Sequence, residues 1–119
     1  MGLDQKLVDG RLGVVLYWQA TGEVERPYNV FFHVVDVRGQ IVAQADGPPA
    51  GGRYPTDLWE SGDVIVDSRE VEVASLPPGR YRILVGLYSL VDGRRLPAAD
   101  RTGRRLPEDA APVGEFSWP

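Results

Sequence analysis

The alternation of apolar and polar residues, broken every few positions by glycine or proline, constrains this fold more than any other feature of the chain. Residues 80–88 show it best. They follow a Pro-Pro-Gly turn and place Tyr81, Ile83 and Val85 on one face, opposite arginines. A period of two is the side-chain repeat of a β-strand, whereas a helix repeats about every 3.6 residues. We therefore predict an all-β protein.

The same pattern predicts strands along most of the chain. Residues 11–19 direct Leu12, Val14, Leu16 and Trp18 toward one face. Residues 28–37 are apolar on both faces, which predicts a central strand that is covered twice. Gly39 and the Asp92-Gly93 pair predict tight hairpin turns. The remaining predicted strands are 40–45, 63–67, 70–73, 94–98 and an edge strand at 113–118.

Seven to nine short strands without crossover helices predict an antiparallel β-sandwich, immunoglobulin-like or jelly-roll, with Greek-key connections. Tyr81 lies two residues after Gly79 of the Pro-Pro-Gly turn, where such sandwiches often place a tyrosine corner. We expect its hydroxyl to bond back to the backbone near that turn.

Length and charge limit the possible classes of protein. The 119 residues suit one domain, 1–119 with a core from about 10 to 118, which we expect to be a fragment of a larger protein. The net charge of -4 argues against nucleic acid and anionic membranes as partners, because both attract basic surfaces. No apolar run is long enough to span a bilayer, so we expect no direct membrane insertion of this domain.

Residue types that carry catalysis or bind metals are scarce. The absence of cysteine excludes a disulfide, a thiol nucleophile and a thiolate metal site. His33 is the only histidine, and we expect it to be a hydrogen-bonded structural residue. Carboxylates near predicted turns lack the spacing of a calcium loop, although calcium binding stays open; they are Asp36, Asp46, Asp57, Asp63, Asp67 and Asp92. We predict no cofactor and no metal.

The long connection at residues 46–62 is the candidate binding site. Long loops in small domains are often functional, and this one carries Arg53, Tyr54, Asp57 and Trp59. Aromatic rings can stack on a sugar, while charged groups bond its hydroxyls. The alternative is that Trp59 folds under the loop and caps one end of the sandwich.

The order of several motifs resembles a known family. The motifs are Leu16-Tyr17-Trp18-Gln19, residues 28–36, residues 54–59, residues 77–81, Val85-Gly86-Leu87-Tyr88 and residues 93–97. Over roughly residues 10–118 the chain resembles the non-catalytic, C-terminal β-sandwich of bacterial, Chloroflexi-type multi-pass membrane proteins of the dolichyl-phosphate-mannose–protein mannosyltransferase-like class. The resemblance implies an extracytoplasmic domain, tethered to a membrane through its parent protein. It implies no transferase chemistry in this segment and no particular site residue.

Three functional hypotheses follow. The first is a non-catalytic accessory module that recognises a glycan or a cell-surface group, or docks on the membrane portion of its parent protein. The second is a glycan-active hydrolase that uses two carboxylates, which would have to face each other across a cleft. The third is a protein–protein module that pairs through an exposed edge strand, 113–118.

Overall fold

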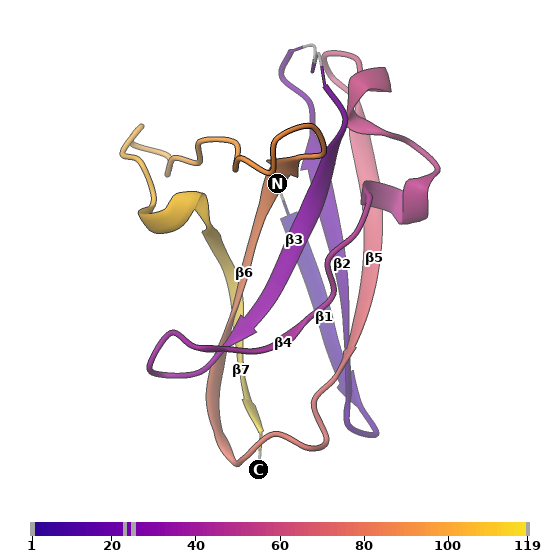
Figure 1. Cartoon of the computed structure of the whole chain (residues 1–119). Helices are drawn as coiled ribbons and strands as arrows, with labels where there is room; N and C mark the ends of the chain where they lie inside the picture. Colours follow the sequence, from indigo (N-terminus) through magenta and orange to yellow (C-terminus); the bar gives the residue numbers. More distant parts are fainter. Residues whose placement is uncertain (1, 23, 25, 119) are drawn as a thin grey trace.

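The computed structural model describes residues 2–22, 24 and 26–118, and these form seven β-strands and no α-helix (Figure 1). The strands are β1 (Gly2–Val8), β2 (Arg11–Gln19), β3 (Tyr28–Val35), β4 (Ile41–Gln44), β5 (Val64–Glu72), β6 (Gly79–Ser89) and β7 (Ala111–Trp118). The short 3-10 turns η1 (Pro49–Gly52), η2 (Thr56–Leu58) and η3 (Pro107–Asp109) lie in connecting loops. The predicted all-β class is confirmed.

The strands form two antiparallel sheets. Sheet A has the order β1-β2-β5, and sheet B has the order β4-β3-β6-β7. The chain changes sheet between β2 and β3, between β4 and β5, and between β5 and β6, which are the connections of a Greek-key sandwich. Near the start of β6 the hydroxyl of Tyr81 donates a hydrogen bond to the carbonyl of Pro77. The predicted tyrosine corner is confirmed, and it is typical of immunoglobulin-like sandwiches.

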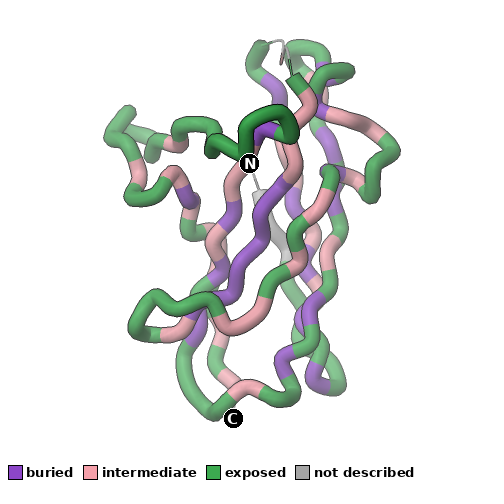
Figure 2. The backbone as a smooth tube through the Cα atoms, viewed as in Figure 1, coloured by how far each residue is buried: buried purple, intermediate pink, exposed green. Residues whose placement is uncertain are grey.

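The core lies between the two sheets, where the alternating residues of both meet. Figure 2 shows the buried positions concentrated along the strands, with exposed positions in the connections. The buried apolar side chains of this main cluster are Leu12, Val14, Leu16, Val30, Phe32, Val34, Val71, Val73, Tyr81, Ile83 and Val85. The inward faces predicted for residues 11–19 and 80–88 are therefore correct.

Strand β3 is central in sheet B and buried on both faces, as predicted. Its outer face is covered by the segment 90–110, whose Arg95 guanidinium lies 4.2 Å from the centroid of the Phe31 ring. Gly86 on β6 leaves space for that ring, since a Cβ there would lie 2.2 Å from it. Val37 was expected to share this buried face, but it is 82% exposed because β3 ends at Val35.

The prediction and the structure differ at three places in the chain. Residues 63–67 and 70–73 are not separate strands, because β5 continues through them. The return strand expected at 94–98 is reduced to one bridge, between Tyr88 and Arg95. Strand β1, which pairs with residues 11–17 of β2, was not predicted, because residues 2–8 hold little apolar alternation.

Candidate recognition site

The loop 46–62 connects β4 in sheet B to β5 in sheet A. Its first half forms η1, in which Ala50 and Gly51 have left-handed backbone angles, with φ of 53° and 64°. Such angles are uncommon for alanine, so local contacts must hold the turn in place. The contact comes from β5: the backbone N–H of Ala50 donates to Asp67 Oδ1 at 3.2 Å.

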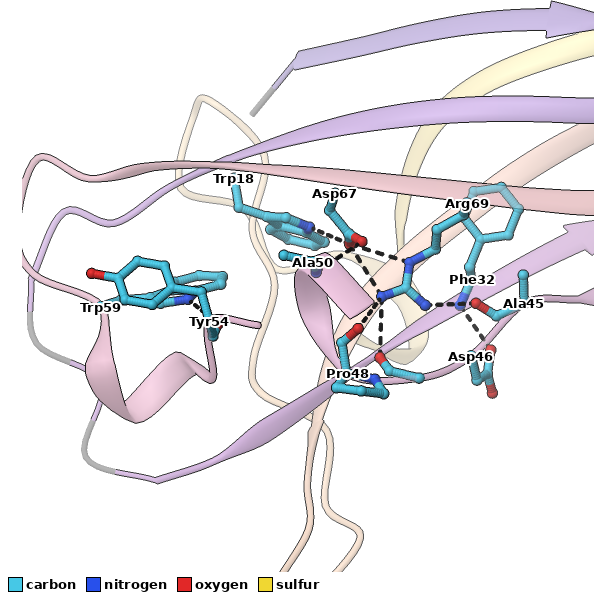
Figure 3. Close-up of polar contacts among 11 residues, drawn as sticks. Trp18, Phe32, Ala45, Asp46, Pro48, Ala50, Tyr54, Trp59, Asp67 and Arg69 are labelled. Atoms are coloured by element: carbon cyan, nitrogen blue, oxygen red, sulfur yellow. Dashed lines mark hydrogen bonds and ion pairs between the residues drawn. The ribbon is translucent and has the colours of Figure 1, made fainter. Parts of the chain in front are cut away.

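Asp67 and Arg69 form a buried ion pair that ties this loop to β5 (Figure 3). Their side chains are 1% and 6% exposed, and Arg69 Nη2 lies 3.1 Å from Asp67 Oδ2. Asp67 Oδ2 also accepts a hydrogen bond from Trp18 Nε1 at 3.1 Å. The carboxylate is thus satisfied by two sheet residues and one loop amide, which offsets much of the cost of burying its charge.

The rest of the Arg69 guanidinium binds loop backbone. Nη1 donates to the carbonyl of Ala45 at 2.6 Å, and Nη2 donates to the carbonyls of Gly47 and Pro48, each at 3.1 Å. A planar guanidinium can bridge several acceptors in a fixed geometry. Residues 45–50, which include the start of the loop, are therefore held by charge-assisted hydrogen bonds.

The second half of the loop is fixed by packing. Thr56 is fully buried, and its hydroxyl accepts from the backbone N–H of Tyr28 at 2.8 Å and donates to the carbonyl of Arg26 at 2.7 Å. Trp59 is 5% exposed and packs with Ala20 and Ile65 in a small second core. The structure thus shows the alternative considered for Trp59, in which it caps one end of the sandwich.

Tyr54 lies against this small core and bonds the end of the loop. Its hydroxyl donates to Asp63 Oδ2 at 2.6 Å, and its carbonyl accepts from Trp59 Nε1 at 2.9 Å. The Tyr54 hydrogen bond lowers the pKa of Asp63 below its usual value, with a further contribution from the backbone N–H of Glu60. The same bond raises the pKa of Tyr54, because the phenol must donate to a carboxylate.

Only two of the four predicted site residues are brought together. Tyr54 and Trp59 contact each other beneath the loop, whereas Arg53 and Asp57 are exposed. Among the described residues, neither the Arg53 guanidinium nor the Asp57 carboxylate has a hydrogen-bond or ion-pair partner. Leu58 beside them is 57% exposed. The loop surface therefore offers a cation, a carboxylate and an aliphatic side chain rather than an aromatic platform.

His33 lies on the outer face of sheet B, away from this loop surface. It is 8% exposed, its Nε2 is 3.5 Å from Asp46 Oδ2, and its ring centroid is 5.1 Å from that of Phe31. Asp46 Oδ1 accepts from the backbone N–H of Phe32 at 2.8 Å. These contacts join β3 to the start of the loop. In the part of the chain that the structure describes, no group of three potential metal ligands comes together.

The Asp67–Arg69 pair was not predicted, although the sequence carries a signal for it. Ile65, Asp67, Arg69 and Val71 occupy alternate, inward positions of one continuous strand. A charged pair at two inward positions between apolar ones predicts a buried ion pair. The division of this segment into two strands hid the pattern.

No protein-family model matches the chain, and no curated protein matches it. Within residues 2–22, 24 and 26–118, no helix has the length and hydrophobicity needed to cross a membrane.

Proposed function

We propose that this β-sandwich is a non-catalytic accessory module that uses the outer surface of the loop 46–62 to recognise a carbohydrate. Arg53 and Asp57 are the groups that would contact the ligand. A guanidinium and a carboxylate supply donors and acceptors for sugar hydroxyls, and Leu58 supplies an apolar contact for ring C–H groups. Tyr54 and Trp59 support the loop from below.

The observation that carries the proposal is the anchoring of the loop by a buried charge. Arg69 directs its guanidinium to two loop carbonyls and to that of Ala45, just before the loop, and Asp67 binds one loop amide. A loop ordered before binding loses less conformational entropy when the ligand arrives. Functional groups are also found disproportionately on loops that a rigid scaffold positions.

A titration followed by amide NMR tests this function. The probes are a mannose disaccharide, an N-acetylglucosamine oligomer and a uronic-acid disaccharide. We expect one of them to shift the amide signals of residues 53–58, and Arg53→Ala and Asp57→Asn to weaken that binding at least about fivefold. Arg38→Ala is the matched control, because Arg38 is also exposed but lies in the β3–β4 turn. If none of the three sugars shifts residues 53–58, the carbohydrate proposal fails.

We further propose that the domain is extracytoplasmic and is tethered to a membrane through a parent protein of the mannosyltransferase-like class. The support is the motif order over roughly residues 10–118, together with the antiparallel sandwich that the resemblance implies. Sequencing the complete gene tests the tether, since the parent protein must encode several membrane helices. A full-length gene without such helices would rule it out.

A further inference from the structure

Gly13 occupies the middle of the central strand of sheet A, and nothing in the described part of the fold requires a glycine there. Its φ is not positive, and β2 pairs without a bulge with both β1 and β5. The nearest atom to an added Cβ is the carbonyl oxygen of Lys6 at 3.8 Å, an ordinary contact. A glycine inside a strand weakens it, and often marks a place where a ligand or another backbone approaches closely.

The outer face of sheet A around Gly13 is open and has two distinct halves. From Gly13 toward the β1–β2 turn it is charged: Lys6 on β1 and Glu70 on β5 line two hollows of ≈ 410 and ≈ 430 Å³, and Arg11 on β2 lines the second. Toward the other end it is apolar, with Val64 58% exposed and Val66 54% exposed on β5. Val66 pairs with Tyr17 and Val64 with Gln19, so both lie further along β2 than Gly13. Neighbouring exposed apolar side chains occur where a partner covers a surface.

The strand register places the charges in a defined row. Lys6 pairs with Gly13, and Gly13 pairs with Glu70, so the three residues lie side by side across the sheet. The two charged residues are separated by the width of the central strand. Arg11 contacts Glu70 at 2.6 Å, and the acidic side chains of Glu70 and Glu72 together raise the pKa of Arg11. The β5 side therefore keeps an excess of negative charge, whereas the β1 side carries Lys6.

From this arrangement we propose that the chain forms a symmetric dimer through the outer face of sheet A. The two-fold axis runs parallel to β2 and passes between the Gly13 residues of the two copies. Such an axis places β1 of each copy over β5 of the other, so Lys6 lies over the second copy's Glu70, and the reverse pair forms by symmetry. It also stacks the apolar half of each face on the apolar half of the other. The two Arg11 side chains approach each other beside the axis, where each keeps its ion pair with Glu70 of its own copy.

The charge row selects this axis over the alternative. A two-fold axis running across the strands would also bring two Gly13 residues together, but it would place Lys6 over Lys6 and Glu70 over Glu70. Like charges facing each other in an interface are strongly unfavourable. Sheets that pack face to face lie about 10 Å apart, a gap that Lys and Glu side chains can bridge. The dimer is independent of the proposed function, because the loop 46–62 contributes no residue to it.

Sedimentation velocity on two charge-reversed variants tests the proposal. Wild type should show a monomer–dimer equilibrium with a Kd on the order of 10 µM that rises with salt. Lys6→Glu alone and Glu70→Lys alone should each raise the Kd at least tenfold, because each homodimer then contains two like-charge pairs. An equimolar mixture of the two variants should regain a heterodimer near the wild-type Kd, since both of its pairs are again opposite in sign.

Two further variants complete the experiment. Gly13→Lys should abolish the dimer, because two long side chains would fill the gap over β2 and add two positive charges beside the Arg11 pair, whereas Gly22→Lys in an exposed loop should leave it intact. Glu115→Lys on the edge strand β7 should also leave it intact, which separates this dimer from edge-strand pairing. Monomeric wild type up to about 1 mM, or a variant mixture that stays monomeric, overturns the proposal.

Discussion

Gly13 in β2 and Gly86 in β6 both lie inside strands, yet we predict that replacing them with alanine has opposite effects on stability. At Gly86 an added Cβ would lie 2.2 Å from Cε2 and Cζ of Phe31 and 2.9 Å from the carbonyl oxygen of Asp109. Carbon atoms in contact are normally about 3.5–4.0 Å apart, so the ring must move by more than about 1 Å. At Gly13 the nearest atom is 3.8 Å away, and nothing has to move.

The size of each effect follows from these contacts. Phe31 is 2% exposed, and pushing its ring out of place loses part of the roughly 1.5–3 kcal/mol that burying such a side chain contributes. The Arg95 guanidinium that covers the ring would also be displaced. We expect Gly86→Ala to lower the free energy of unfolding by about 2–3 kcal/mol. Gly13→Ala should raise it by about 0.5–1 kcal/mol, because alanine restricts the unfolded chain and suits a strand better.

Urea unfolding followed by tryptophan fluorescence measures both changes. The protein concentration must stay well below the dimer Kd, since dimerisation would add to the apparent stability of any variant that retains it. Unchanged stability in Gly86→Ala would refute the argument that Phe31 occupies the space above that glycine. A loss at Gly13 as large as the loss at Gly86 would show that strand glycines matter here for backbone reasons alone.

The remaining predictions concern buried and paired polar groups. Arg69→Met should lower the free energy of unfolding by about 3–5 kcal/mol in urea, because it leaves Asp67 buried without its cation, whereas adding Asp67→Asn should recover part of the loss. Tyr81→Phe should cost on the order of 1 kcal/mol by the same assay, and no loss would mean that the corner hydrogen bond contributes nothing. The hydrogen bond from Arg105, followed by the Ala98 backbone N–H, lowers the pKa of Asp109 to about 2. The ionised Asp109 carboxylate therefore stabilises the fold fully above its ordinary pKa of 3.8, and this stabilisation is lost as the pH falls toward about 2. In Arg105→Ala, an NMR titration should show the pKa of Asp109 moving back up.

Most of the fold could be predicted from local patterns. The alternation at residues 11–19 and 80–88 identified the inward faces, and the apolar residues on both faces of 28–37 identified the central strand, although β3 ends at Val35. Strand β1 was not predicted, because an edge strand needs little apolar alternation to pair with its neighbour, here β2. The return strand predicted after Gly93 does not form, because this segment instead places Arg95 over the ring of Phe31. That contact joins residues far apart in the sequence.

The candidate site was predicted less completely than the fold. Composition marked the loop 46–62 as unusual and its aromatic residues as important, but it did not distinguish a buried tryptophan from an exposed one. Trp59 is buried because it fills the space beside Ala20, which directly follows β2, and Ile65 in β5. That space exists only once the sheet has formed.

The sequence by itself determined that this chain forms strands, where most of them turn, and which side chains face inward, because these properties depend on neighbours one to four residues apart. Only the tertiary structure decided which strands share a sheet, that Asp67 and Arg69 hold the loop, and which glycine has a ring above it. Those outcomes depend on surfaces that meet across long sequence separations, such as Phe31 with Gly86. The same separation explains why Lys6, Gly13 and Glu70 form a row that no local pattern reveals.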